Sequence, residues 1–151
     1  MSTQPLRIGL FGFGVVGQGL YHVLQQTDGV QTEVVRICVK DKEKPRTIAP
    51  QRFTFSSDDI LLDPNIDVVV ELIDDADDAF EIVRRAMRLG KAVVSANKKL
   101  IATRLQELLD LQQETGVPFL YEASTGGSIP IIRNLEEYYD TDHLKSIEGI
   151  V

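Results

Sequence analysis

The sequence lacks the residue types on which small proteins held together by disulfides or zinc depend. Its 151 residues include one cysteine, Cys38, two histidines and no tryptophan. A single cysteine cannot form an internal disulfide, and it forms no closely spaced zinc-binding cluster with the two histidines. Since 43% of the residues are hydrophobic and 26% are charged, the composition instead indicates one ordinary globular domain.

An excess of positive charge and long apolar runs are also missing. The 16 Lys and Arg residues are outnumbered by 23 Asp and Glu residues, which gives a formal net charge of −7. We therefore expect no nucleic-acid partner. Apolar runs such as residues 68–70 fall far short of the roughly 20 residues of a membrane helix, and residues 1–6 lack the pattern of a secretion signal. We expect no membrane partner and a cytoplasmic location.

Apolar stretches of strand length alternate with segments of helix length. The expected strands span 6–11, 33–39, 67–72, 92–95, 118–121 and 145–151. The expected helices span 15–26, 57–62, 76–89, 98–115 and 129–138. This alternation is typical of β-α-β units, and strands without polar interruptions are typical of sheets covered on both faces. The sequence predicts an α/β fold with a doubly wound parallel sheet.

A glycine-rich motif follows the first expected strand and precedes the first expected helix. It consists of Gly12, Phe13, Gly14, Val15, Val16 and Gly17. In a dinucleotide site, Gly12 permits the tight turn, Gly14 lets the backbone approach a pyrophosphate, and Gly17 allows close packing of the helix on the strand. The alternative is a strand-to-helix turn that is glycine-rich for structural reasons alone. The context favours a Rossmann-type dinucleotide-binding domain.

The end of the second expected strand bears on the choice between NAD and NADP. An acidic residue there binds the ribose 2′-hydroxyl of NAD, whereas a basic one accommodates the 2′-phosphate of NADP. Lys40 and Asp41 both occupy this region, and residues 40–52 contain five basic and two acidic residues. This local positive charge favours NADP, although a solvated loop without a special role is the alternative.

Two further segments follow expected strands, at the edge where open α/β sheets bind ligands. We expect five of their residues to line the cofactor site, namely Leu72, Ile73, Ala96, Asn97 and Lys98. A lysine placed there can exchange a proton with a carbonyl substrate. From the residues alone, Lys98 and Lys99 are equally compatible with exposed positions in the first turn of a helix, although lysine opposes the helix dipole there.

The segment 121–130 is rich in small residues and glycines and precedes the last expected helix. Its carbonyl groups could bind a monovalent cation and its N–H groups a ligand anion. An ordinary strand-to-helix connection is the alternative.

Taken together and in order, four blocks of this sequence resemble the amino-terminal, nucleotide-binding part of homoserine dehydrogenases. The blocks are residues 12–19, 69–73, 96–102, and 121–124 continuing through 129–135. The resemblance implies NAD(P)-dependent interconversion of L-homoserine and L-aspartate 4-semialdehyde, a small-molecule reaction of threonine and methionine biosynthesis. It also implies a cytoplasmic protein that forms a homo-oligomer at full length.

The resemblance also implies roles for individual residues. Lys98 aligns with a family lysine that transfers a proton to or from the substrate oxygen. The loop that follows the fifth expected strand resembles the family's monovalent-cation site, whose ligands are largely backbone carbonyls. The corresponding residues here are Glu122, Thr125, Gly127 and Ile129.

Two features depart from the family pattern. Asp74 and Asp75 stand where the family commonly has two glycines; carboxylates close to a pyrophosphate would repel it, so they either turn to solvent or weaken binding. The family also continues into a substrate-binding domain. We therefore expect residues 1–140 to form the NAD(P)-binding domain and residues 141–151 to begin a truncated substrate and dimerisation domain.

These departures define the expected activity and its alternatives. We expect the 151-residue chain to bind dinucleotide without oxidising homoserine by itself. A non-catalytic nucleotide-sensing module is one alternative, and another amino-acid dehydrogenase, such as an aspartate dehydrogenase, is a second.

Overall fold

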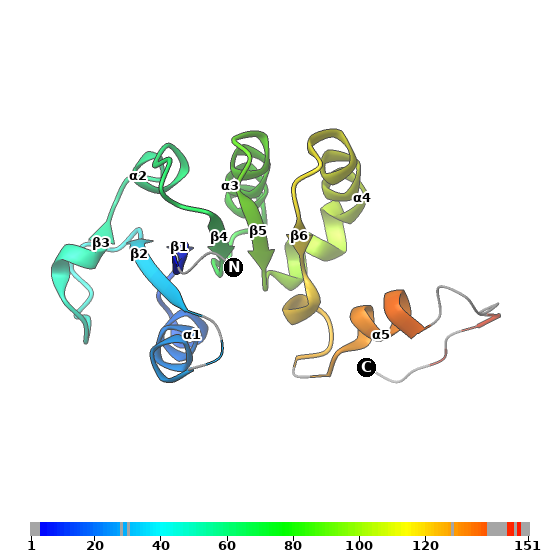
Figure 1. The fold of residues 1–151 in the computed structure, drawn as a ribbon, viewed down its shortest axis with the longest axis horizontal. Coiled ribbons are helices and arrows are strands. Elements are labelled where there is room, and N and C mark those ends of the chain that lie inside the picture. Colours follow the sequence, from blue (N-terminus) through cyan, green and yellow to red (C-terminus); the bar gives the residue numbers. More distant parts are fainter. Residues whose placement is uncertain are drawn as a thin grey trace.

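A six-stranded parallel sheet forms the centre of the computed structural model, which describes residues 4–27, 29, 31–127, 129–138, 145, 146 and 148 (Figure 1). The strands are β1 (Leu6–Phe11), β2 (Thr32–Cys38), β3 (Phe53–Thr54), β4 (Val68–Glu71), β5 (Ala92–Ser95) and β6 (Phe119–Leu120). The α-helices are α1 (Val15–Gln26), α2 (Asp58–Leu61), α3 (Ala76–Arg88), α4 (Lys98–Thr115) and α5 (Ile131–Tyr138). Two 3₁₀ turns, η1 (Pro50–Arg52) and η2 (Glu122–Ser124), complete the elements.

The strand order is β3-β2-β1-β4-β5-β6, and every neighbouring pair is parallel. The chain therefore runs outward from β1 in one direction and then returns to build the other half of the sheet from β4. This order confirms the predicted doubly wound fold. It also creates a switch point between β1 and β4, where open α/β sheets bind their ligands at the carboxyl ends of the strands.

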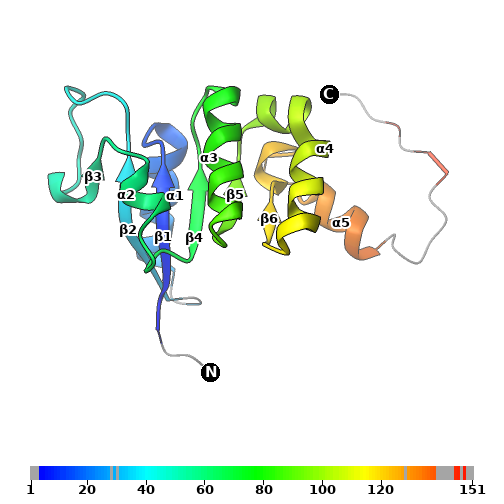
Figure 2. The same cartoon turned by 90° about the horizontal axis from the view of Figure 1, so that it is seen from above.

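Helices cover both faces of the sheet, as the apolar strands predicted. Helices α2, α3 and α4 lie on one face and α1 lies on the other (Figure 1). Neighbouring strand residues alternate between the two cores: Phe11 and Val69 pack toward α3, whereas Leu10 and Val70 pack on the side of α1. Figure 2 shows α3 and α4 side by side over their half of the sheet. The described residues contain no helix that is both long and apolar enough to span a membrane.

Five predicted strands are confirmed, with ends that differ by at most one residue. Strand β3 was missed because its two residues follow the polar residues Gln51 and Arg52, whereas the equally short β6 lies within the apolar run 117–121. The last helix begins at Ile131 instead of residue 129. Of the strand expected at 145–151, residues 145, 146 and 148 are not in a strand, and the others lie outside the described residues, as do residues 139–144.

Candidate functional site

The glycine motif forms the turn between β1 and α1, and the packing of the protein itself requires two of its glycines. Gly12 has a φ of 94°, and a Cβ atom there would lie 2.7 Å from the Leu72 carbonyl oxygen. A Cβ atom on Gly17 would lie 2.6 Å from the Gly12 carbonyl oxygen. Both contacts are with backbone atoms, so a side chain at either position would push apart β1, α1 and the segment after β4.

Gly14 differs, because no close contact with a neighbouring residue requires a glycine at this position. A Cβ atom at Gly14 would meet nothing within 4 Å, and the residue has an ordinary negative φ of −78°. Gly14 is also the N-cap of α1, where no side chain caps the helix. By contrast, side chains cap the other two helices longer than eight residues, α3 and α4. The amide groups that begin α1 are therefore available to an anion, and the absence of a side chain lets it approach closely.

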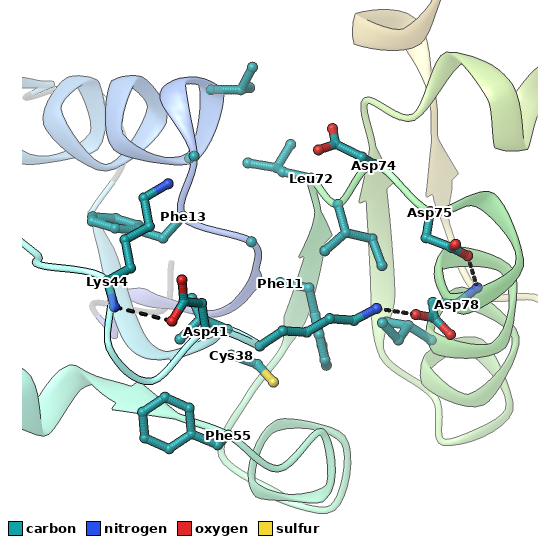
Figure 3. Close-up of a pocket in the computed structure, with 18 of the residues that line it drawn as sticks. Phe11, Phe13, Cys38, Asp41, Lys44, Phe55, Leu72, Asp74, Asp75 and Asp78 are labelled. Atoms are coloured by element: carbon teal, nitrogen blue, oxygen red, sulfur yellow. Dashed lines mark hydrogen bonds and ion pairs between the residues drawn. The ribbon is translucent and has the colours of Figure 1, made fainter.

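The turn opens into a cavity of about 980 Å³ at the switch point of the sheet (Figure 3). Asp41 and Lys44 lie on one side of it, Asp75 and Asp78 on the opposite side, and Leu72 between them (Figure 3). A second cavity of about 300 Å³ shares Val16, Leu72, Ile73 and Asp74 with the first. The two cavities thus adjoin along the carboxyl ends of β1, β4 and β5, an arrangement with room for the two halves of a dinucleotide.

The structure brings together all the residues that the sequence assigned to the cofactor. The first cavity is lined by the predicted residues Gly12, Phe13, Gly14, Val15, Val16, Gly17, Lys40, Asp41, Leu72 and Ile73. The second is lined by Ala96, Asn97 and Lys98, together with Lys99. Sequence reasoning missed Phe55 and Asp78, which also line the first cavity. It counted Lys44 and Arg46 only as part of the local charge, although both line this cavity too.

Lys40 and Asp41 have different surroundings in the first cavity. The Lys40 Nζ atom donates a hydrogen bond to Asp78 in the first turn of α3, on the opposite side of the cavity (Figure 3). This bond raises the pKa of Lys40. One carboxylate oxygen of Asp41 accepts the backbone N–H groups of Glu43, at 2.9 Å, and Lys44, at 3.2 Å. Asp41 therefore shapes its own loop, while Lys40 extends across the cavity.

Arg46 holds the same loop together. Its guanidinium donates hydrogen bonds to the carbonyl oxygens of Lys44, at 3.0 Å, and Asp41, and lies 4.8 Å from the centre of the Phe53 ring. A guanidinium in this position keeps its positive charge next to the cavity on a side chain that is already ordered.

The two aspartates that depart from the family pattern have separate positions. Asp75 is the N-cap of α3, and its carboxylate accepts the N–H groups of Asp77, at 3.0 Å, and Asp78, at 2.9 Å. These hydrogen bonds lower the pKa of Asp75. Asp74 is exposed and lines both cavities. Asp75 thus has a structural role, because its carboxylate accepts N–H groups in the first turn of α3 that would otherwise lack a partner within the helix.

A buried carboxyl group contacts residues that line the second cavity. Glu71, the last residue of β4, is 0% exposed and accepts hydrogen bonds from the Ser95 hydroxyl, at 2.6 Å, and the Ile73 N–H, at 2.7 Å. Burial raises the pKa of Glu71, although these hydrogen bonds and the Asn97 side chain oppose the shift. Asn97 caps α4 by accepting the Leu100 N–H at 3.0 Å, and Lys98 is the first, exposed residue of that helix.

The candidate cation loop lies between β6 and α5. The Glu122 carboxylate accepts the N–H groups of Ile132, at 3.2 Å, and Arg133, at 2.8 Å, at the start of α5. The backbone carbonyl oxygen of Glu122 accepts a hydrogen bond from the Thr125 hydroxyl at 2.9 Å. Gly127 and Ile129 follow on the same loop, and residue 128 between them is outside the described residues. In the part of the chain that is described, no group of three His, Cys, Asp or Glu side chains could hold a metal ion.

Comparison with known proteins identifies the family. The model for the NAD-binding domain of homoserine dehydrogenases matches residues 12–122, which include the glycine turn and every residue that lines the two cavities except Phe11. The chain belongs to this family. The homoserine dehydrogenase of Bacillus subtilis is 35% identical over 98% of this chain and 36% of its own length. The sequence resemblance to homoserine dehydrogenases is thereby confirmed.

Solved structures agree in fold. A homoserine dehydrogenase from Thiobacillus denitrificans superposes with a TM-score of 0.82 at 38% identity, over 89% of this chain and 33% of that one. A hyperthermophilic archaeal homoserine dehydrogenase in complex with NADPH gives a TM-score of 0.73 at 24% identity, over 87% of this chain and 48% of that one. This homoserine dehydrogenase domain therefore spans about a third of the length of the curated relatives it matches.

Proposed function

We propose that this chain is the dinucleotide-binding part of an oxidoreductase that interconverts L-homoserine and L-aspartate 4-semialdehyde. Gly14 is the observation that carries the proposal. It lies at the uncapped start of α1, beside the large cavity, and the space that its Cβ atom would fill contains no protein atom. A pyrophosphate bound to the α1 amide groups explains why this position has no side chain.

The residues around the second cavity would serve the reacting end. A bound nicotinamide supplies the hydride chemistry. Ile73 and Asn97 would hold the ring against the carboxyl ends of β4 and β5, since both line the cavity. The Lys98 ammonium, at the start of α4, would exchange a proton with the oxygen of the small-molecule substrate. We assign Lys98 the catalytic role, with Lys99 as its neighbour.

NADP is the preferred cofactor in this proposal. Lys40, Lys44 and Arg46 supply three positive charges at the first cavity, whereas the Asp41 carboxylate is already bonded to its own loop. A 2′-phosphate would take the place of Asp78 as the partner of Lys40. Charge-assisted bonds of this kind are stronger than a bond from a neutral ribose hydroxyl.

We also propose a monovalent cation at the loop formed by Glu122, Thr125, Gly127 and Ile129, with backbone carbonyls as its main ligands. The nucleotide-sensing alternative loses one of the features that favoured it. Asp75 was one of the two aspartates that argued for weakened dinucleotide binding, and its carboxylate instead caps α3.

Titration with NADPH, followed by nicotinamide fluorescence, tests the proposal. We expect saturable binding to the 151-residue chain and loss of that binding in Gly14→Ala, with a stability cost below about 1 kcal/mol because alanine is only a poorer N-cap than glycine. Gly19→Ala is the matched control, because a Cβ atom there also meets nothing within 4 Å but lies further along α1. Equal binding by the wild type and both variants would contradict the role of Gly14, and a wild type that binds no dinucleotide would refute the proposed function.

A further inference from the structure

Glu71 is a buried acid for which the proposed reaction has no direct use. It is 0% exposed, and none of the ion pairs formed by the described residues includes it. A carboxyl group without a cationic partner is costly to bury unless hydrogen bonds satisfy it. The buried Glu71 carboxyl group therefore depends on its hydrogen bonds, and the residues that these bonds connect indicate its role.

The hydrogen bonds of Glu71 join two segments that are distant in sequence. One carboxyl oxygen accepts the Ile73 N–H, directly after β4, and the other accepts the Ser95 hydroxyl, at the end of β5. Asn97 completes the connection, because its side-chain amide donates to the Ile73 carbonyl at 2.9 Å and its N–H donates to the Ser95 oxygen at 3.2 Å. Glu71 is thus the centre of a hydrogen-bond network that fixes both strand ends relative to each other.

Both fixed segments face the second cavity. Asn97 and Lys98, the proposed catalytic residue, line the second cavity alone, and Ile73 lies where the two cavities adjoin and lines both. Asn97 in turn caps α4 through the Leu100 N–H. The network therefore runs from the Glu71 carboxyl group through Ser95 and Asn97 to the Leu100 N–H in the first turn of α4, whereas Glu71 itself does not line either cavity.

We propose that Glu71 is a positioning residue that holds Ile73 and Asn97 in place for the nicotinamide end of the bound cofactor. This inference rests on the proposed function, and it adds a residue that does not touch the cofactor. The inference predicts different effects on the two halves of the site. Disturbing the network weakens binding of the nicotinamide end, and it leaves binding of the adenosine end, by the glycine turn and Lys40, unchanged.

The chain contains a matched structural control. Lys91 is 6% exposed and uses its Nζ atom in the same way, donating to the carbonyl oxygens of Asp63, at 2.5 Å, and Ile66, at 2.8 Å. These residues precede β4, and Lys91 precedes β5, so this second buried connection lies at the amino ends of the strands. It ties together the same two strands at the edge of the sheet away from both cavities.

Two ligands distinguish positioning from general stability in Glu71→Gln. NADPH reports on the whole site, and 2′,5′-ADP, which lacks the nicotinamide, reports on the adenosine end. We expect the affinity for NADPH to fall about tenfold, the size expected for one lost hydrogen bond to a charged group, with a loss of the fluorescence change of the bound nicotinamide. The affinity for 2′,5′-ADP stays within twofold of the wild type. Lys91→Met lowers the melting temperature and changes neither affinity.

Other outcomes overturn the inference. Equal losses for NADPH and 2′,5′-ADP in Glu71→Gln would show a merely structural role, and no loss for either would show that the network does not position the site. If Glu71→Gln fails to fold, Ser95→Ala decides, because it removes one donor to the same carboxyl group and is expected to weaken NADPH selectively. A wild-type chain that binds neither ligand would refute the proposed function itself, which the titration of the wild type reveals before any variant is compared.

Discussion

Replacing Gly17 by alanine tests whether α1 is held against β1 by the close contact that the structure shows. The new Cβ atom would lie 2.6 Å from the Gly12 carbonyl oxygen, whereas ordinary contacts begin at 3.4 Å, so the two backbones must separate by 3.4 − 2.6 = 0.8 Å. Neither partner is a flexible side chain. Relief therefore requires α1 to move away from the sheet, where Leu20, Tyr21 and Leu24 pack against the core.

The expected cost follows from overpacking. Extra volume forced into a packed interface costs about 1–3 kcal/mol. Alanine also has a higher helix propensity than glycine, by about 1 kcal/mol. This second effect applies equally to Gly19→Ala in the same helix, where the Cβ atom enters open space. The difference between Gly17→Ala and Gly19→Ala thus isolates the contact and amounts to about 1–3 kcal/mol, or about 2–12 °C in melting temperature for a domain of this size.

Thermal unfolding followed by circular dichroism measures this difference directly. NADPH titration of the same two variants adds a second measurement, since a displaced α1 moves its amide groups away from the pyrophosphate position. We expect weaker NADPH binding in Gly17→Ala and unchanged binding in Gly19→Ala. Melting temperatures that agree within about 1 °C for the two variants would refute the reasoning, because a contact cost of only about 1 kcal/mol already separates them by about 2 °C or more.

Three further predictions concern charged residues of the site. Lys40→Ala lowers the affinity for NADPH about tenfold and leaves the affinity for NADH unchanged, as measured by parallel titrations. Equal losses of affinity for the two cofactors would contradict binding of the 2′-phosphate by Lys40. Asp75→Ala removes the α3 cap and lowers the free energy of unfolding by about 1 kcal/mol in urea titrations; an unchanged value would contradict the capping role. Because burial raises the pKa of Glu71 in the folded chain, its stabilising contribution is complete in acid and is lost as the pH rises through that pKa. Unfolding in urea at pH 5 and pH 8 should therefore show Glu71→Gln gaining stability relative to the wild type at the higher pH, and a constant difference would argue against the raised pKa.

The parts of the fold that could be predicted from sequence are those buried on both sides. Strands β1 and β4 contain the apolar runs 8–11 and 68–70 because helices cover both faces of the sheet, and that pattern identified them. Strand β3 escaped prediction because Phe53 and Thr54 stand next to the polar residues Gln51 and Arg52 and form no apolar run. The other edge strand, β6, is equally short but was predicted, because it lies within the apolar run 117–121.

The site was predictable to a similar extent. The residues predicted next to strand ends line the two cavities, since parallel strands bring their carboxyl ends to one edge. Asp75 was judged by its distance from a pyrophosphate, although an aspartate directly before a helix is a standard N-cap signal that could have identified its role. The pairing of Lys40 with Asp78 and of Glu71 with Ser95 spans 38 and 24 residues, and no local pattern predicts such contacts.

The distribution of caps explains how one edge of the sheet can be both stable and receptive to a ligand. Asp75 accepts two amide groups in the first turn of α3, Asn97 accepts one in the first turn of α4, and Glu71 joins the ends of β4 and β5. These side-chain caps and the Glu71 hydrogen bonds hold the walls of the cavities in place. At α1 the N-cap is Gly14, and no side chain occupies the amide groups. Because uncapped amide groups leave hydrogen bonds unmade, an anion bound there would complete what the protein has left open, and the dinucleotide would stabilise the domain at the same point where the glycines admit it.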